Sequence, residues 1–361
     1  MALKNGLAIT TFLALLSTSS LSLACDSEFF DECLDGVGPA VTSSDSLRIS
    51  SSQISKSLKE REDSDKNDTA AQLNGTTGKS AGDNFGRWSV WGSYAGTDFD
   101  ADIALNNALD GLGNPVPAAI YDGDTHNLLI GADTLIGSRF VVGVALGYES
   151  TDITTEYNGG DNESDAYSIT PYAAYLINDI FSIDVSAGYT SLDYDTDRID
   201  NTNGNTIRGD FDSDRWFVAS NLNAVINKGN WYFAGRVGYL YTEEDQDDYT
   251  ETGGPTARTI DDRHIDLTQF VVGLDVSYNL GMFEPYAIIS YLNDINRDEG
   301  ADAGGLPDGV AASVDDDDEV QSGIGLRLYD NGVSGTLEWT KVIGRDSFDS
   351  DTFMFTLRAD I

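Results

Sequence analysis

Residues 350–361 read SDTFMFTLRADI, and this final stretch decides the fold that we expect for the chain. Mostly polar residues alternate there with the apolar side chains of Phe353, Phe355, Leu357, Ala359 and Ile361. A period of two is typical of a β-strand with one apolar face. Chain ends usually fray unless a partner holds them. The pattern therefore predicts that the last residues pair, as a strand, with another part of the chain.

The same alternation recurs from residue 88 onward. Each alternating segment spans about ten residues, which is the length that a tilted strand needs to cross a bilayer. Together with the final stretch, the sequence predicts twelve strands, at residues 88–94, 127–133, 140–148, 167–175, 181–189, 216–224, 231–241, 268–278, 283–291, 320–328, 333–339 and 353–361.

The connections between these segments alternate between short and long. Five have the composition of hairpin turns, at residues 136–138, 178–179, 227–230, 279–281 and 330–332. Five others are long and acidic, at about residues 97–124, 150–165, 192–214, 243–263 and 294–318. Transmembrane barrels have tight periplasmic turns and long extracellular loops. The sequence therefore predicts an all-β fold, a 12-stranded antiparallel transmembrane β-barrel.

The two faces of the predicted strands differ in chemistry. A wall of twelve strands encloses more space than these side chains can fill, so we expect the apolar face to contact lipid. The other face then lines a polar lumen, with charged residues at Asp184, Arg236, Asp275, Arg327, Glu338 and Arg358. An open sheet edge is very costly in lipid, so the last strand must pair with the first. The apolar residues of this closing strand, which we expect to direct assembly, include Phe353, Phe355, Leu357 and Ile361.

The residues ahead of the predicted barrel differ from it in composition. A cationic start, a short apolar stretch and small residues before Cys25 predict a signal peptide at residues 1–24. Cys25 and Cys33 are expected to form a small disulfide loop in an oxidising compartment, and a lipid anchor on Cys25 is the alternative. Residues 25–83 are predicted to be a short, mostly disordered passenger or linker, and residues 84–361 the barrel.

Within this N-terminal segment, one stretch has helical periodicity. Leu47, Ile49, Ile54 and Leu58 are spaced as on one face of a helix. The stretch after them, up to about residue 83, is rich in Asp, Lys, Asn and Gly and has the composition of a linker. We therefore predict one short amphipathic helix ahead of the barrel.

The charge and the motifs limit the function. The chain carries 61 acidic and 21 basic residues, for a net charge of −40, which repels nucleic acid. The two histidines, His126 and His264, share the parity of the lipid-facing residues on their strands. The sequence contains no GxSxG, P-loop or HExxH motif. We expect neither a nucleic-acid partner nor an enzyme activity.

Acidic residues continue the outward parity of the strands beyond their aromatic positions. Asp98 with Asp100, and Asp193 with Asp195, have the spacing of the first half of an EF-hand loop. Both sites lack the glycine and the closing glutamate that the EF-hand requires, so we reject that motif. No organic cofactor is expected. The four carboxylates are interpreted as weak Ca²⁺ or Mg²⁺ sites that bridge to lipopolysaccharide, and the alternative is that they only solubilise the loops.

Five segments carry a family resemblance. They are RWSVWGSYAG (87–96), NLLIGAD (127–133), FVVGVALGYE (140–149), AYSITPYAAYL (166–176) and FSIDVSAGYTSLDYDTDR (181–198). In combination with the twelve strands, they make residues 84–361 resemble the translocator β-domain of the autotransporter family. The combination of Gly131-x-Asp133 with Gly143 and Gly147 is the more specific part of the pattern.

The resemblance implies a barrel in the bacterial outer membrane with an N-terminal segment threaded through its pore. Here that segment would run from Ser46 to about Asn84, and its charged residues would meet those of the lumen. It also implies insertion by the outer-membrane assembly machinery. We expect a monomer in contact with outer-membrane lipid and lipopolysaccharide.

Two features depart from the family pattern. The chain ends in Ile361, where the family usually has an aromatic residue, and the segment ahead of the barrel is very short for a passenger. Whether this segment is exported or plugs the pore stays open at this point. The alternatives are a porin-like diffusion channel and a surface adhesin that acts through its acidic loops.

Overall fold

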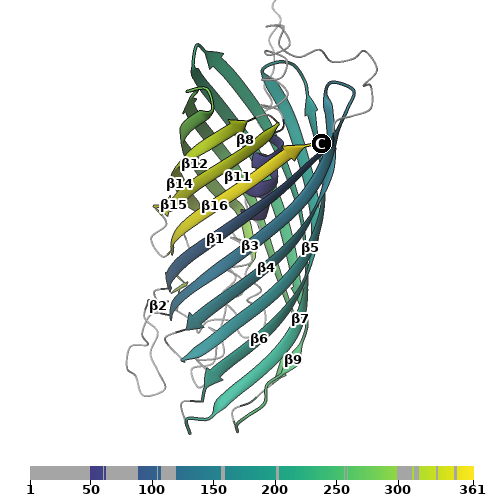
Figure 1. The fold of residues 1–361 in the computed structure, drawn as a ribbon. Helices are drawn as coiled ribbons and strands as arrows, with labels where there is room; N and C mark the ends of the chain where they lie inside the picture. Colours follow the sequence, from purple (N-terminus) through teal and green to yellow (C-terminus); the bar gives the residue numbers. More distant parts are fainter. Residues whose placement is uncertain are drawn as a thin grey trace, which may run out of the picture.

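The structure, a computed structural model, describes residues 49–59, 61, 88–103, 105–106, 119–155, 159–200, 203–255, 257, 259–298, 311–312, 317–330, 332–344 and 348–361. Twelve strands close into one barrel, in the order β1-β16-β15-β14-β12-β11-β8-β7-β6-β5-β4-β3, and all neighbouring pairs are antiparallel (Figure 1). This is the fold that the alternating sequence predicts.

The barrel strands are β1 (Trp88–Ile103), β3 (Ala119–Ile136), β4 (Phe140–Thr155), β5 (Gly160–Leu176), β6 (Phe181–Ile199), β7 (Thr206–Lys228), β8 (Trp231–Gln246), β11 (Arg263–Tyr278), β12 (Phe283–Asp298), β14 (Asp318–Asp330), β15 (Val333–Ile343) and β16 (Phe348–Asp360). Four short strands form two further pairs, which are β2 (Leu105–Asn106) with β13 (Ala311–Ala312) and β9 (Tyr249–Thr250) with β10 (Thr259–Ile260).

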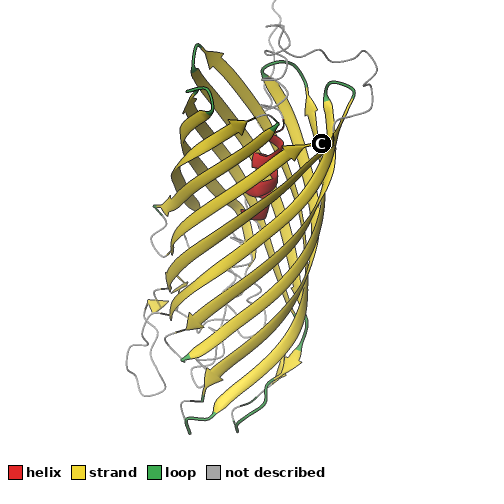
Figure 2. Cartoon of the chain, viewed as in Figure 1, coloured by secondary structure: helices red, strands yellow, loops and turns green. Residues whose placement is uncertain are grey.

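One helical segment, at residues 49–59 and 61, lies inside the barrel near the end where the chain terminates (Figure 2). Among the residues listed above, no helix has the length and apolar character needed to cross a membrane. The predicted signal peptide, Cys25, Cys33 and the linker at residues 62–83 lie outside the described residues.

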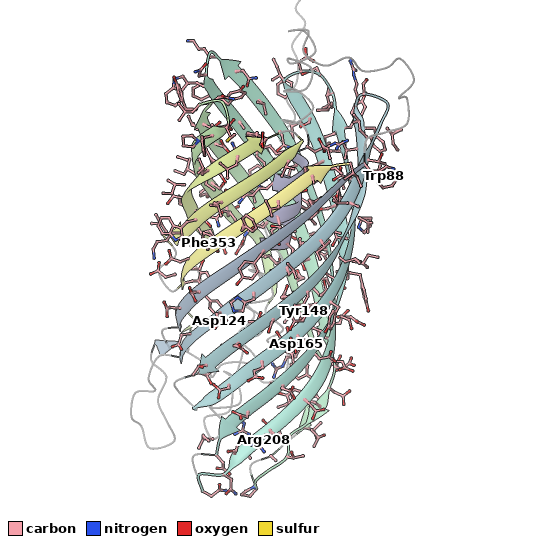
Figure 3. All side chains as sticks on the ribbon, viewed as in Figure 1. Trp88, Asp124, Tyr148, Asp165, Arg208 and Phe353 are labelled. Carbon is pink, nitrogen blue, oxygen red and sulfur yellow. The ribbon has the colours of Figure 1, made fainter. Side chains whose placement is uncertain are left out.

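The terminal strand closes the barrel as predicted. Gly92 of β1 lies opposite Leu357 of β16, and the Ile361 amide donates a hydrogen bond to the Trp88 carbonyl at 2.8 Å. The other edge of β16 pairs with β15, so both edges of the last strand are satisfied. Phe353, labelled in Figure 3, projects from the outer surface and is 50% exposed.

The outer surface of the barrel wall is apolar and its inner surface is polar. Ile130, Leu146 and Ile324 are 61%, 60% and 61% exposed, which is far more than a soluble core would allow. Their neighbours on each strand point inward, and many of these are buried Ser, Thr, Asn or charged residues. Such a surface is suited to acyl chains and not to water.

The strands are longer than the sequence pattern indicates, and much of the predicted acidic loops is strand. β7 has 23 residues and β6 has 19, so most of the predicted loop at residues 192–214 belongs to these two strands. Beyond the aromatic positions the polarity of the two faces is reversed. Leu192, Tyr194 and Phe211 point inward and are buried, while the aspartates between them are exposed. The alternation continues with the opposite parity, which explains why a search for outward apolar residues ends too early.

Acidic residues on this extension lie directly opposite one another. Seven carboxylates from seven consecutive strands form one row, Asp351, Asp98, Asp124, Asp152, Glu163, Asp195 and Asp210. Like charges that face each other across strands destabilise a sheet. The seven carboxylates therefore lie in one row although their charges repel one another.

The short turns lie at the end of the barrel where the chain terminates. Gly229 and Gly332, in the β7–β8 and β14–β15 turns, have φ angles of 65° and 82°. A side chain at these positions would be strained, so glycine permits the tight reversal. All five predicted short turns lie at this end, but the connections at the other end are not uniformly long, because β4 ends at Thr155 and β5 begins at Gly160.

Candidate functional site in the barrel lumen

The helix at residues 49–61 packs its apolar face on one side of the lumen. Ile54 and Leu58, one helical turn apart, are 1% and 2% exposed. They belong to one buried cluster with Trp91, Leu129, Val141, Ala145, Tyr172, Ala174, Phe217, Ala219 and Leu240 of the barrel wall. This contact fixes which face of the helix meets the β1–β8 side of the barrel.

Serine hydroxyls fix the depth of the helix. Asn127 donates a hydrogen bond to Ser50 at 2.9 Å, and Asn221 donates one to Ser55 at 3.0 Å. Arg358 donates to Ser57 at 2.8 Å. Serine is a modest helix former, and a helix of this length is unstable alone in water. The wall therefore supplies the stabilisation that the sequence of the helix lacks.

Three cations of the helix contact carboxylates of the wall. Lys56 pairs with Glu338 on β15, and Lys59 pairs with Asp275 on β11 at 2.9 Å. Arg61 donates to Asp360 on β16 at 2.9 Å. The helix is therefore held by opposite charge along its length as well as by its apolar face.

Asp133 on β3 is the centre of a buried network at the C-terminal end of the helix. Both its oxygens accept bonds from the Arg358 guanidinium, at 2.6 and 3.1 Å, and Arg61 Nε lies 3.9 Å away. Tyr172 donates to Asp133 at 3.0 Å, and Trp91 donates to the Tyr172 hydroxyl at 2.6 Å. The network joins β1, β3, β5 and β16 to the helix, across the seam where the barrel closes.

Glycines make room for the aromatic members of this network. A Cβ on Gly131 would lie 2.3 Å from the Trp91 ring, and a Cβ on Gly143 would lie 2.3 Å from the Tyr172 ring. Each ring lies flat against the neighbouring strand because that strand has no side chain there. This explains the Gly131-x-Asp133 spacing in the sequence, in which Gly131 positions Trp91 and Asp133 ends the hydrogen-bond chain.

The charged residues predicted for the lumen all face it. Asp184 accepts bonds from Asn221 and Asn223, each at 2.7 Å. Arg327 contacts Asp275 and Glu284, and Glu338 also accepts a bond from Tyr286. Arg236 lines the space beside the helix, and Arg358 binds Asp133 as described above.

Sequence reasoning missed several partners in the lumen. Asp133, Glu284 and Asp360 accept buried ion pairs of the site, yet only Asp133 had a sequence signal, the glycine two residues before it. Leu47 of the predicted helix lies outside the described residues, and the helix is described at residues 49–59 and 61. Glu60 and the pore segment beyond Arg61 lie outside the described residues.

A second group of buried charges lies beyond the first turn of the helix, on the side away from the chain terminus. Arg215 on β7 donates to Glu244 on β8 at 2.7 Å and to Glu149 on β4 at 3.1 Å. Tyr194 also donates to Glu244, at 3.0 Å. Further up, Arg198 and Glu251 form a buried bidentate pair at 2.9 and 2.8 Å. Buried ion pairs therefore line the lumen on the β4–β8 side, between the helix and the end of the barrel opposite the chain terminus.

The comparisons with known proteins agree with this geometry. The sequence model of the autotransporter β-domain matches residues 116–340. This chain belongs to the autotransporter β-domain family. Autotransporter barrels reside in the bacterial outer membrane and are inserted there by the assembly machinery, as the family resemblance predicts. No curated protein sequence matches the chain.

Solved autotransporter structures have the same fold. The translocator domain of the autotransporter NalP from Neisseria meningitidis is 13% identical, with 86% of this chain and 98% of that chain covered and a TM-score of 0.60. The β domain of the Bordetella autotransporter BrkA is 16% identical (75% and 99% covered, TM-score 0.55). The transport unit of the autotransporter AIDA-I from Escherichia coli is 11% identical (82% and 97% covered, TM-score 0.55).

The predicted cation-site residues of this autotransporter barrel lie on its extracellular extension. Asp98, Asp100, Asp193 and Asp195 all point outward. Asp193 hydrogen-bonds Asp212 on the next strand, and this shared proton raises the pKa of Asp193 above its ordinary value. Within the described ranges, none of the four belongs to a group of three residues arranged to chelate an ion.

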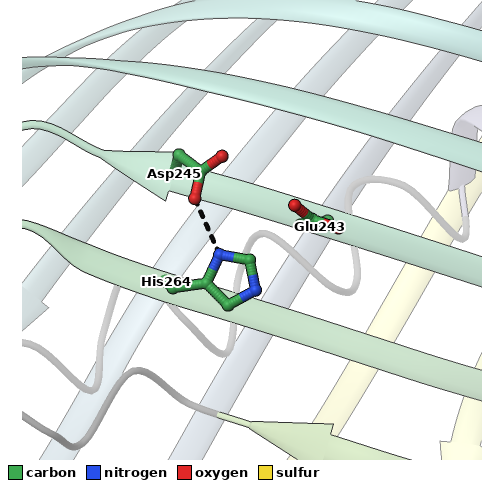
Figure 4. A group of neighbouring side chains, drawn as sticks. All are labelled: Glu243, Asp245 and His264. Carbon is green, nitrogen blue, oxygen red and sulfur yellow. Dashed lines mark hydrogen bonds and ion pairs between the residues drawn. The ribbon is translucent and has the colours of Figure 1, made fainter.

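One group of the autotransporter extension does have that arrangement. Ligand atoms of Glu243, Asp245 and His264 lie within 4.8 Å of one another above the aromatic rim (Figure 4). His264 Nδ1 lies 2.7 Å from Asp245, and this hydrogen bond raises the pKa of His264. Glu243 accepts a bond from Tyr241 at 2.8 Å. These contacts explain why the three side chains lie close together, with His264 and Asp245 as an ion pair on the surface.

The two histidines of the autotransporter barrel point outward from different strands. His126 on β3 hydrogen-bonds Tyr94 at 2.9 Å and lies 3.2 Å from Asp124, and His264 is on β11. Both are exposed on the outer surface. They do not face each other across the lumen.

Proposed function

We propose that this autotransporter barrel carries residues 25–48 through its lumen to the cell surface and then keeps the helix in place as a plug. The direction of the helix carries the proposal. Its last residue, Arg61, binds Asp360 beside the short turns, which in such barrels are periplasmic. Its first turn binds Asn127 in the middle of β3. The helix therefore runs from the middle of the lumen, at Ser50, to the periplasmic end, at Arg61, which is the direction that export of the residues ahead of it requires.

The length of the N-terminal segment fits this path. Residues 25–48 number 24, and an extended chain of that size reaches about 80 Å. The segment is therefore long enough to leave the barrel at its extracellular end. A plug that returned to the periplasm would have to reverse inside a lumen that already holds a helix.

The tight fit of the helix argues against the porin-like alternative. Its apolar face is buried, and Lys56, Lys59 and Arg61 each pair with a wall carboxylate. Two cavities beside it have volumes of about 80 and 110 Å³. A diffusion channel needs a continuous aqueous path, which the paired helix obstructs.

The export direction is tested with the natural cysteines. In a Cys25→Ser variant, Cys33 is the one thiol in the chain. We expect a membrane-impermeant maleimide to label Cys33 on intact cells. Two controls in a cysteine-free background calibrate the result, Asp248→Cys beyond β8 on the extracellular side and Lys228→Cys in the β7–β8 turn on the periplasmic side. Labelling of Cys33 only after permeabilisation, as for Lys228→Cys, would contradict export.

We also propose that the barrel acts as a monomer and without enzymatic chemistry. Every edge of the barrel sheet is paired within one chain, so no strand needs a second copy as a partner.

The outward carboxylate row favours contact with lipopolysaccharide through Ca²⁺ or Mg²⁺, because bound divalent cations would offset its repulsion. A thermal stability of the folded protein that is unchanged by a chelator would contradict this bridging.

A further inference from the structure

The helix does not fill the lumen evenly. It packs against the β1–β8 side, and two adjoining cavities of about 80 and 110 Å³ remain between it and the opposite wall. Ser52, Lys56, Arg236 and Gln321 line both cavities. A polar cavity of this size has room for several water molecules or for a small ion.

Arg236 on β8 differs from seven other cations of the lumen. Each of those seven binds a carboxylate, in the pairs Lys56–Glu338, Lys59–Asp275, Arg61–Asp360, Arg198–Glu251, Arg215–Glu244, Arg327–Glu284 and Arg358–Asp133. Among the residues that the structure describes, Arg236 forms no ion pair within 4.0 Å and no hydrogen bond, and the acidic groups that act on it from a greater distance are Asp184 and Glu338. A guanidinium has five N–H donors and no acceptor, so these donors face the cavity unused.

The carboxylates near Arg236 are occupied by other groups. Asp184 accepts bonds from the side-chain amides of Asn221 and Asn223. Glu338 is bound by Lys56 and by the Tyr286 hydroxyl. Donors from the wall and the helix therefore occupy these two carboxylates, and neither of them accepts a hydrogen bond from Arg236.

The cavity around Arg236 is rich in donors. The larger one is also lined by Lys59, Arg327, Asn223 and the hydroxyls of Ser55 and Ser290, and by the carboxylates of Asp184, Asp275 and Glu338. With Lys56 and Arg236, its lining has four basic and three acidic side chains, an excess of one positive charge. A charged group removed from bulk water needs a partner of opposite charge. We propose that this cavity binds a small inorganic anion of the size of chloride, with the Arg236 guanidinium as its main ligand.

The site follows from the asymmetric position of the helix. The helix supplies Ser52, Ser55 and Lys56 to the cavity, and the wall supplies Arg236. Occupancy by an anion would therefore depend on the helix being in place. The proposal does not depend on the direction in which the N-terminal segment is exported.

The experiment uses chloride and bromide as probes on the full-length barrel. In nanodiscs, we expect the wild-type barrel to broaden the chlorine NMR signal of added chloride, and bromide to reverse this broadening. Arg236→Met is expected to reduce the excess broadening severalfold. Arg208→Met is the matched control, because Arg208 is an exposed arginine near the extracellular end of β7 (Figure 3). Its loss is expected to leave the broadening unchanged.

Equal broadening by the wild type and Arg236→Met would overturn the proposal, as would an equal loss in Arg208→Met. If Arg236→Met does not fold, crystals of the wild-type barrel grown with bromide decide the question. Anomalous density within hydrogen-bond distance of Arg236 supports the site. Its absence from the cavity at a bromide concentration that saturates the NMR effect refutes it.

Discussion

At the residue scale, missing side chains are as important to the lumen wall as charged ones. Gly131 and Gly143 each leave the space that an aromatic ring from the next strand occupies. Gly325 does the same for Tyr286, whose hydroxyl binds Glu338. The rings lie along the wall, so their polar ends reach the network around the helix. A methyl group at such a position displaces the ring and, with it, a hydrogen bond.

The substitution Gly143→Ala tests this packing. The added Cβ would lie 2.3 Å from Tyr172, so the ring must move and its bonds to Trp91 and Asp133 weaken. We expect a loss of about 1–3 kcal/mol in the free energy of unfolding, measured by urea unfolding in lipid vesicles. Gly235→Ala is the matched control, because a Cβ there meets nothing within 4 Å. An equal loss in both variants would indicate a backbone effect and not a clash.

Gln53 is a second residue whose replacement is informative. It is 0% exposed on the helix, and neither its side-chain oxygen nor its nitrogen has a hydrogen-bond partner among the described residues. A buried polar group without a partner costs about 1–3 kcal/mol. We therefore expect Gln53→Met, which keeps the shape, to raise the temperature at which the heat-modifiable band is lost on a gel. Ser51→Ala on the cavity side is expected to have little effect.

At the scale of elements, the closure of β16 on β1 depends on one buried arginine. Arg358 binds Asp133 and Ser89 on the wall and Ser57 on the helix. Removing one partner of a buried pair leaves an uncompensated charge, which costs about 3–5 kcal/mol. Exposed ion pairs are worth about 0–1 kcal/mol.

The contrast between Arg358→Gln and Lys341→Gln follows from this difference. Lys341 on β15 forms an exposed pair with Asp351 on β16, so both variants remove an ion pair of the same strand. We expect Arg358→Gln to lower the free energy of unfolding several times more than Lys341→Gln. Equal effects would mean that the closing strand is held by its backbone bonds alone.

The β8–β11 hairpin carries the pH-sensitive pair His264–Asp245. The hydrogen bond from His264 to Asp245 raises the pKa of His264 above 6.5, so the contact stabilises the fold fully below that pH and is lost as the pH rises through the raised pKa. In a His126→Gln background, NMR titration measures His264 alone, because the chain has two histidines. We expect Asp245→Asn to lower the pKa of His264. An unchanged pKa would show that Asp245 does not stabilise the protonated form of His264.

The elements could be predicted from the sequence, but not their full length. Alternation located twelve strands and their short turns because lipid imposes one apolar face on every crossing. Beyond the aromatic positions the outer surface of the barrel faces water and not lipid. Leu192 and Phe211 therefore point inward, and the apolar residues change parity. The partners of the lumen charges could not be predicted, because Arg61 and Asp360 lie far apart in sequence and meet only after closure.

At the scale of the whole molecule, the barrel has two halves that differ in what surrounds and fills them. The membrane half is apolar outside and holds a cationic helix against wall carboxylates. The outer half is acidic outside, with a packed cluster of Ala166, Leu192, Tyr194 and Phe211 inside. Each half therefore depends on a different interaction, the first on lipid and the helix, the second on its own apolar packing.

The opposed acidic row gives the outer half a dependence on its medium that the inner half lacks. Neighbouring strands lie about 4.8 Å apart, well inside the Debye length of about 10 Å at 0.1 M salt and about 30 Å at 0.01 M. In dilute water the strand tips repel one another around half of the barrel, and in brine this repulsion is weaker. The part of the protein that faces the surroundings thus carries a line of fixed charge whose self-repulsion grows on dilution and falls as ionic strength rises.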